Sequence, residues 1–153
     1  MTLDPKIFTV HDVSALPYVV FNQRAAGPGY ARQWGAEMVA LVNHGEPFVV
    51  VYDQLRTDES HEDRKQRAVW LKHNKAALAE VCKALVSIEP DDAQRAMVKV
   101  MGETAVKAFG IPHEAVATRE EAIALVRRLI GSLGLPKTGD NDGDYDVRAA
   151  PFE

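Results

Sequence analysis

Hydrophobic residues recur along this 153-residue chain in two patterns, one typical of strands and the other typical of helices. Phe48-Val49-Val50-Val51-Tyr52 is continuously apolar and is closed by Asp53. Continuous rather than alternating hydrophobicity indicates a strand that is covered on both faces, as in a parallel sheet. The β-rich composition of five segments, and the turn-forming residues that bound them, predict five strands: Lys6–His11, Pro17–Gln23, Phe48–Asp53, Ala84–Ile88 and Glu114–Ala117.

Four segments with helical spacing separate or follow these strands. The first, Tyr30 to Asn43, ends at Gly45, and the second begins after Ser60 and runs to about Glu80. Ser60 with Asp63 resembles a capping box, and Thr118 with Glu121 is a clear one. We expect these side chains to face the core: Trp70, Ala77, Leu78 and Val81 in the second helix, Met97, Val100, Met101, Ala105, Ala108 and Phe109 in the third, and Ala122, Leu125, Val126, Leu129 and Ile130 in the fourth.

The element order is therefore β-β-α-β-α-β-α-β-α, which predicts an α/β domain with a mixed, mostly parallel five-stranded sheet and four helices. We expect right-handed crossovers between the later strands to lay the helices on the sheet and to leave an antiparallel strand near one edge. We place this domain at residues 1–136. Residues 137–153 hold four aspartates between Asp140 and Asp146 and little apolar surface, which predicts an acidic flexible C-terminal tail.

Composition narrows the classes of function. A net charge of −4 with a pI near 5.7 disfavours general nucleic-acid binding. The longest apolar stretches are far shorter than the roughly 20 residues of a membrane span, and the N-terminus lacks a signal-peptide pattern. Cys82 is the single cysteine, so no internal disulfide can form. These observations favour a cytoplasmic protein without a membrane span.

Motifs for common cofactors and catalytic groups are missing from the sequence. No two of the five histidines have the spacing of a metal pair on a helix, and Cys82 has no companion cysteine. Neither a nucleophile elbow nor a Gly-rich phosphate loop is present. We therefore expect no metal, no cofactor and no catalytic residue.

The segment that follows the third strand is the most distinctive part of the chain. Asp53 stands at the carboxyl end of that strand, where open α/β sheets place their ligand crevices. A polar loop then leads to Ser60 at a helix N-terminus, a position that suits an anion or a phosphoryl group. Capping is the more usual role of a serine at this position.

The helix after Ser60 is locally basic. Arg64, Lys65, Arg67, Lys72 and Lys75 fall within twelve residues that contain no acid. Their spacings spread around the helix, so they do not all share one face. One interpretation is a solvated helix whose charges pair with neighbouring loops, and the other is a docking surface for an acidic partner or a phosphorylated ligand.

The element order resembles that of the STAS domain, the fold of bacterial anti-sigma-factor antagonists and their SpoIIAA-like relatives. The resemblance covers about residues 6–134 and includes Phe48–Asp53, Arg64-Lys65 with Trp70, and the helix start Thr118-Arg119-Glu120-Glu121-Ala122. In that family a phosphorylatable serine opens the helix after the third strand, which implies Ser60, or Thr57, as the matching residue here. The family's Asp-Ser-Ser-Gly-type signature is absent, so the chain is more similar to the divergent SpoIIAA-like group.

Three functions remain open from the sequence. The first is a non-enzymatic STAS-like interaction or regulatory module that docks a protein partner, or a second copy, through Asp53, Thr57, Ser60, Arg64, Lys65 and Lys72. The second is a domain that binds a small anionic or lipid-like ligand in the same crevice. The third is a small enzyme whose site combines Asp53, His61 and Arg64.

Overall fold

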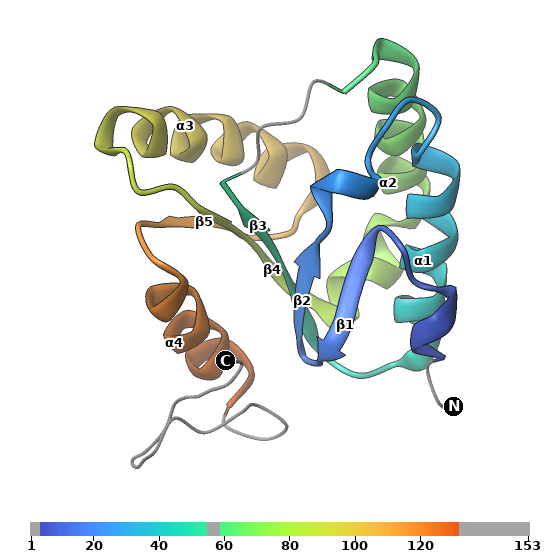
Figure 1. The fold of residues 1–153 in the computed structure, drawn as a ribbon, viewed down its shortest axis with the longest axis horizontal. Coiled ribbons are helices and arrows are strands. Elements are labelled where there is room, and N and C mark those ends of the chain that lie inside the picture. The colour runs from blue at the N-terminus through green and yellow to red at the C-terminus, as the bar shows by residue number, and fades with distance from the viewer. Residues whose placement is uncertain (1–3, 55–58, 132–153) are drawn as a thin grey trace.

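A computed structural model describes residues 4–54 and 59–131 of the chain. Within these residues the chain forms five strands, four α-helices and two short 3₁₀ helices (Figure 1). In chain order they are η1 (Pro5–Ile7), β1 (His11–Ala15), β2 (Tyr18–Phe21), η2 (Gln23–Ala25), α1 (Ala31–His44), β3 (Phe48–Asp53), α2 (His61–Val81), β4 (Cys82–Ile88), α3 (Asp92–Phe109), β5 (His113–Val116) and α4 (Arg119–Ile130).

The strands form one mixed sheet in the order β1-β2-β3-β4-β5. β1 pairs with β2 antiparallel at one edge, and β2 to β5 are parallel to one another. This confirms the predicted α/β class, the five-stranded mixed sheet and the four helices. The strand and helix order also matches the predicted one, including an antiparallel strand at the edge.

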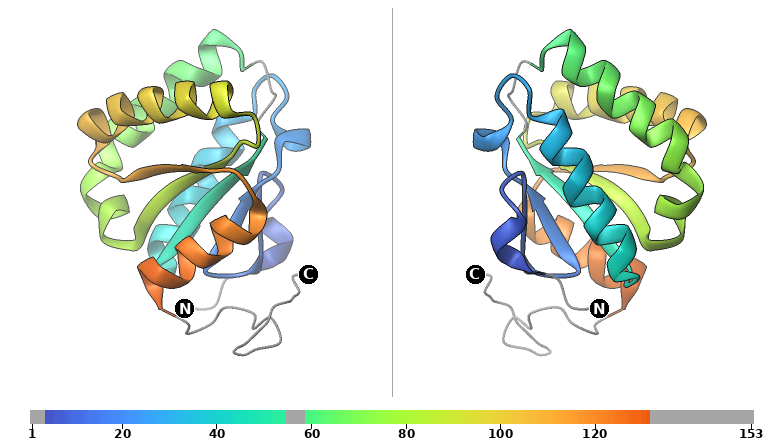
Figure 2. Two further views of the ribbon diagram at one scale, coloured as in Figure 1. Left: turned by 90° about the vertical axis from the view of Figure 1, so that its left-hand side faces the viewer. Right: turned by 90° about the vertical axis from the view of Figure 1, so that its right-hand side faces the viewer.

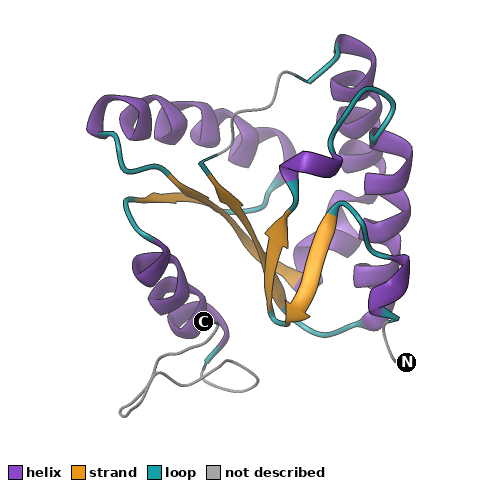
Figure 3. Cartoon of the chain, in the orientation of Figure 1, coloured by secondary structure: helices purple, strands orange, loops and turns teal. Residues whose placement is uncertain are grey.

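Helices cover the two faces of the sheet unequally (Figures 2 and 3). α1 and α2 pack on one face, where Trp34, Met38 and Leu78 join the first core cluster. α3 follows on the same face, since it packs on β5 through His113. α4 alone covers the other face, where Val126 packs with Val51 and its neighbours. Three successive crossovers in one direction, each right-handed, give this arrangement.

The continuous apolar run of β3 is covered on both faces, as its pattern predicts. Val49 and Val51 belong to the cluster under α4, and Phe48 and Val50 belong to the cluster under α1 and α2. All four side chains are at most 1% exposed. β3 is therefore the central strand around which both cores are built.

The prediction of a strand at residues 6–11 is wrong. Residues 5–7 form the 3₁₀ helix η1, and the strand begins at His11 and includes the segment that we interpreted as a connection. Asp4 caps η1 by accepting a hydrogen bond from the Lys6 amide at 3.0 Å. The strand itself has the period-2 pattern of a half-covered edge, with His11 and Val13 buried and Asp12 exposed.

The predicted inward face of the third helix is also largely wrong. Met97, Val100 and Met101 are 63%, 62% and 68% exposed, and Ala108 is exposed as well. α3 faces the sheet through Gly102, which is buried and leaves room for the imidazole of His113. The close approach that a glycine permits thus decides which side of this helix packs.

Two further side chains that we expected in the core are exposed, namely Ala77 in α2 and Leu129 in α4. The remaining predicted core positions of α4 are buried or half-buried, and Thr118 caps this helix through the Glu121 amide at 3.1 Å. Gly45 ends α1, as predicted, and Gly110 ends α3; both glycines have a positive φ. The predicted tail at residues 137–153 lies outside the described residues.

Gly102 supplies a direct test of how α3 is held. A Cβ at this position would lie 1.9 Å from His113 Nδ1, so Gly102→Ala requires α3 or the imidazole to move. We expect a loss of about 1–3 kcal/mol in the free energy of unfolding, measured by urea denaturation. Gly27→Ala is the matched control, because a Cβ there meets no atom within 4 Å. A Gly102→Ala protein as stable as this control would contradict the packing, and adding His113→Ala should restore most of the loss.

Candidate interaction site

The carboxyl ends of the parallel strands and the start of α2 form the region that the sequence singles out. Asp53 ends β3 and is exposed, and its backbone carbonyl accepts a hydrogen bond from the Gln23 side chain at 3.2 Å. Gln54 follows with φ of 50°, a left-handed conformation that costs a non-glycine residue about 1 kcal/mol. Its amide donates to the carbonyl of Ile88 at 2.9 Å, which fixes the turn after β3. Thr57 lies outside the described residues.

Ser60 is the N-cap of α2, which confirms the capping interpretation. Its Oγ accepts a hydrogen bond from the Asp63 amide at 3.1 Å and donates one to Asp63 Oδ2 at 2.6 Å. The hydroxyl is half-buried and lies directly against a carboxylate. A phosphoryl group on Ser60 would place two like charges side by side, so this geometry disfavours phosphorylation there.

Asp63 ties the start of α2 to the start of α1. Its carboxylate is 3% exposed and accepts hydrogen bonds from the amides of Gly29 at 2.9 Å and Ala31 at 3.0 Å. These amides have no partner within α1, whose own N-cap, Tyr30, makes no side-chain capping bond. The hydrogen bonds from Ser60 and from the two amides hold the pKa of Asp63 below its ordinary value. One carboxylate therefore accepts hydrogen bonds at the N-termini of both α1 and α2.

Glu59 and Arg67 form a second anchor beside the first. Arg67 donates to both Glu59 oxygens, with Nη2 at 2.7 Å from Oε1, and Tyr30 donates its hydroxyl to Oε2 at 2.7 Å. The guanidinium also lies over the Trp34 ring, 5.5 Å from its centroid. Burial opposes ionisation of Glu59, but the bonds from Arg67 and Tyr30 outweigh it and lower its pKa. Arg67 is thus partnered inside the domain.

The other basic residues of α2 are more exposed than Arg67, and only Arg64 among them contacts this anchor. Successive helix residues are about 100° apart, so Arg64, Lys65, Lys72 and Lys75 share a sector of about 100°. All four are exposed, with Arg64 Nε 3.8 Å from Glu59 and its side chain 66% exposed. Among residues 4–54 and 59–131 no ion pair joins these three lysines to an acid. We call these four residues the cationic side of α2.

A cavity of about 540 Å³ lies beside Asp53, over β1 and β2. Its charged lining residues are Asp12, Arg24 and Asp53, and Ser14 and Gln23 add neutral polar groups. Sequence reasoning placed Asp53 at a crevice but missed the contribution of β1, because the strand was assigned to the wrong residues. The cavity and the cationic side of α2 are separate features of the described chain, since no residue of α2 lines the cavity.

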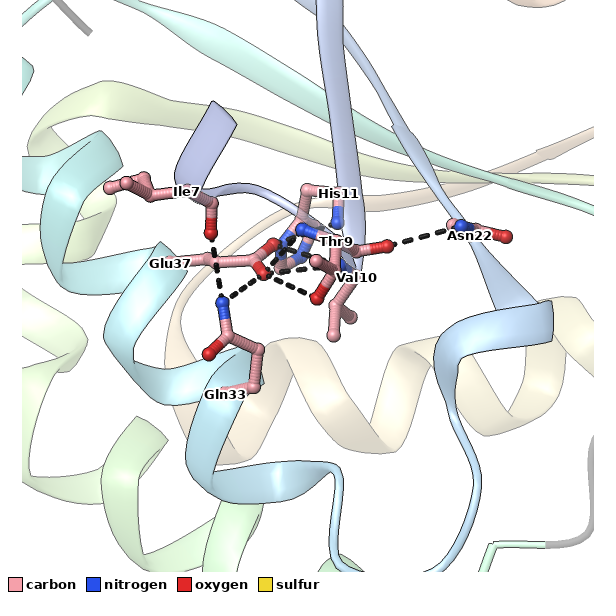
Figure 4. Close-up of polar contacts among 7 residues, drawn as sticks. All are labelled: Ile7, Thr9, Val10, His11, Asn22, Gln33 and Glu37. Atoms are coloured by element: carbon pink, nitrogen blue, oxygen red, sulfur yellow. Dashed lines mark hydrogen bonds and ion pairs between the residues drawn. The ribbon is translucent and has the colours of Figure 1, made fainter. Parts of the chain in front are cut away.

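Glu37 of α1 holds the segment that forms one wall of this cavity (Figure 4). Its carboxylate is 1% exposed and accepts hydrogen bonds from the amides of Thr9 at 2.8 Å, Val10 at 3.1 Å and His11 at 2.8 Å. Gln33 Nε2 donates at 2.6 Å, and His11 Nδ1 donates at 3.0 Å because a carboxylate can only accept. A buried charge with this many donors is well compensated. No sequence signal pointed to this pair.

The structure does not assemble the predicted enzymatic group. Within the described residues no hydrogen bond or ion pair joins Asp53, His61 and Arg64, and His61 is exposed at the first residue of α2. A serine–histidine contact does occur elsewhere, between Ser87 Oγ and His113 Nε2 at 3.3 Å. Burial lowers the pKa of His113, but its Nδ1 has no partner, so no described carboxylate orients the ring as a catalytic triad requires.

Cys82 and the histidines give no sign of a metal site. Cys82 is buried and unpaired, and burial raises the pKa of its thiol to about 12. In the part of the chain that the structure describes, no group of three or more histidine, cysteine, aspartate or glutamate residues could hold a metal ion. None of the described helices is long and apolar enough to cross a membrane.

Comparison with known proteins adds no identification: no protein-family model, curated protein or solved structure matches this chain. The resemblance to the STAS domain therefore stays a prediction. The α/β fold itself is established by the sheet order and helix placement described above.

Glu37 generates a prediction for stability. Burial opposes its ionisation, but the hydrogen bonds from His11, the Thr9 and Val10 amides and Gln33 outweigh burial and lower its pKa from 4.5 to about 2. The ionised form then stabilises the fold by roughly 3 kcal/mol above about pH 4.5, and this contribution is lost as the pH falls towards 2. We expect Glu37→Gln to lower the free energy of unfolding by about this amount at neutral pH.

The measurement is urea denaturation of wild type and variant between neutral pH and pH 2. Glu37→Gln should show a weaker loss of stability on acidification than wild type, since it lacks the titrating group. Glu46→Gln, which removes an exposed carboxylate, is the control. If the two variants are equally stable at neutral pH, the buried carboxylate does not hold β1 in place.

Proposed function

We propose that this domain is a non-enzymatic interaction module of the STAS-like type, which docks an acidic protein partner along α2. The observation that carries the proposal is the sorting of basic residues around this helix. Arg67 is bound inside the domain by Glu59, while Arg64, Lys65, Lys72 and Lys75 are exposed in one sector. Arg64 keeps a long contact with Glu59 at 3.8 Å, and among the described residues the three lysines form no ion pair. A cluster of like charges on a rigid helix raises the rate and the selectivity of association with an acidic surface.

The surroundings of the helix support the same function. α2 has 21 residues but buries two of them, Asp63 and Leu78, so most of its surface is available. The anchors at Asp63 and Glu59 fix the start of the helix against α1, and Leu78 fixes its end in the core. A partner would therefore meet a backbone that is already ordered, and the ordering cost of binding would be confined to the long side chains. Asp53 and Ser60 support the site by shaping the turn and the cap rather than by binding.

Reversing two charges tests this docking surface. We expect the Arg64→Glu/Lys65→Glu protein to lose its partner in affinity capture from extract of the source cells, and wild-type capture to weaken as salt is raised. Lys6→Glu/Lys99→Glu is the matched control, because it changes the net charge equally at exposed positions outside α2. Equal capture by wild type and both variants would show that α2 is not the docking surface.

Binding of a small anionic ligand is the second candidate, and the cavity beside Asp53 supports it. Arg24 is the cation of the lining and would hold a carboxylate or phosphate, while Gln23, Asn22 and Ser14 can hydrogen bond to it. Asp12 and Asp53 also line the cavity and repel an anion. Because of this mixed lining, we rank the ligand below the protein partner.

Native mass spectrometry of the freshly purified protein distinguishes this second candidate. A bound molecule should appear as a fixed mass increment, and Arg24→Ala should remove it while Arg64→Ala leaves it in place. Protein without any increment, and without stabilisation by a panel of small carboxylates and phosphates in thermal denaturation, would rule this candidate out.

A further inference from the structure

The second half of α2 carries cations that have no acid nearby on the helix. Lys72 and Lys75 lie there and are both exposed. Residues three or four positions apart are neighbours on a helix surface, and none of the residues at these spacings from either lysine is an acid. The ion pairs among residues 4–54 and 59–131 include neither of them. The described fold therefore leaves this part of the cationic side without a partner.

A run of acidic residues follows the last helix of the fold. Residues 138–147 contain no lysine or arginine but four aspartates: Asp140, Asp142, Asp144 and Asp146. This run belongs to residues 132–153, which lie outside the described residues. Its four carboxylates equal the cationic side of α2 in number and are opposite in sign. The chain thus contains its own charge complement to this helix.

α2 and α4 end at the same edge of the sheet. Val81, the last residue of α2, leads directly into β4 at Cys82, so α2 ends where a parallel strand begins. α4 follows the carboxyl end of β5 and returns along the opposite face of the sheet, against β3 and β4. The left view of Figure 2 shows the last turn of each helix at the left of the molecule. The chain after Gly131 therefore leaves the fold at the edge where α2 ends.

The acidic run lies far enough from Gly131 to reach this half of α2. Adjacent layers of a fold lie about 10 Å apart, so helices on opposite faces of one sheet are about 20 Å apart. Lys75 and Lys72 stand six and nine positions before the end of α2, or about 9 and 14 Å along the helix. Asp140 and Asp146 follow Gly131 by nine and fifteen residues, and extended chains of these lengths span roughly 30 and 50 Å. The later aspartates can thus pass round the sheet edge to both lysines.

Covalent attachment makes such a charge contact effective. Single ion pairs between exposed side chains contribute little to binding. A segment that is joined to its site by a short linker, however, is present at an effective concentration on the order of millimolar. The exposed lysines of α3 attract the segment less, because Lys99 and Lys107 each stand four positions from Glu103.

From these observations we propose that the acidic segment Asp140–Asp146 docks on the cationic side of α2, with contacts centred on Lys72 and Lys75. The docked segment covers the surface that an acidic partner would use, so the partner has to displace it. The docking requires no partner, whereas the competition rests on the proposed function. A segment that covers the helix in about two thirds of the molecules weakens partner binding about threefold.

Paramagnetic relaxation in the full-length chain tests the docking. A nitroxide is attached to Gly143→Cys, which lies within the acidic run and removes none of its charges. Cys82 is buried, and wild type treated with the same reagent controls for labelling there. We expect the amide signals around Lys72 and Lys75 to lose the most intensity relative to the reduced nitroxide. About 1 M salt shortens the Debye length to about 3 Å and should restore these signals.

Charge variants of the labelled chain test which residues make the contact. Changing the four aspartates of the run to asparagine should abolish the loss of intensity on α2, and so should Lys72→Glu/Lys75→Glu. Lys99→Glu/Lys107→Glu is the matched control, because it makes the same change in charge at exposed positions of α3. This control should keep the intensity loss on α2.

Three results would overturn the docking: intensity loss spread evenly over the domain, loss confined to the end of α4 around Arg128, and loss on α2 that persists in the asparagine variant. The competition is tested separately by affinity capture, in which the asparagine variant should retain about threefold more partner than wild type. Equal capture would show that the docked segment does not compete. Failure of both proteins to capture a partner would count against the proposed function and would leave the docking result unchanged.

Discussion

The carboxylate of Asp63 is the interaction on which the placement of α2 depends. It accepts the amides of Gly29 and Ala31 at the start of α1, and it exchanges two hydrogen bonds with Ser60 at the start of its own helix. Both helices begin at the same end of the sheet because they follow parallel strands, so one acid can satisfy both starts. This bond sets the rotation of α2 about its axis. Arg67 then meets Glu59 and Trp34, and the remaining cations face outward.

Several acids of this domain, like Asp63, join one element of the fold to another. Three buried or half-buried acids hold elements together: Asp63 joins two helices, Glu37 joins α1 to the segment before β1, and Glu59 joins α2 to Tyr30. Each of these acids is surrounded by donors that lower its pKa, which suits a fixed charge rather than a proton carrier. The cationic side of α2 remains exposed among the described residues.

Much of the fold follows from local sequence patterns. The apolar run Phe48–Val51 predicts a strand covered on both faces, and glycine or capping residues place most helix ends within a residue or two. The sequence-based predictions fail where residues far apart in the sequence determine the local structure. The strand β1 begins later than its β-rich composition suggests, because Glu37, 26 to 28 positions away, takes the amides of residues 9–11. α3 has apolar residues on two sides, and the contact of Gly102 with His113, rather than periodicity, selects the inner one.

The candidate site was predictable in part for similar reasons. The basic character of residues 64–75 is visible in the sequence, and so is the N-cap at Ser60. The separation of Arg67 from the other cations is not, because it requires Glu59, Tyr30 and Trp34 to come together from three segments. A crevice at Asp53 was predicted, but most of its lining was not, because two walls of the cavity come from β1 and the loop after β2.

The central claim is that α2 is the surface through which this domain meets an acidic partner. Backbone amide NMR shifts of the isotopically labelled chain, recorded with and without the partner isolated by affinity capture, test it most directly. We expect the largest changes at residues 64–75, centred on Lys65 and Lys72, and small changes around Arg24 and Asp12. Changes concentrated at the cavity beside Asp53, with α2 unaffected, would contradict it.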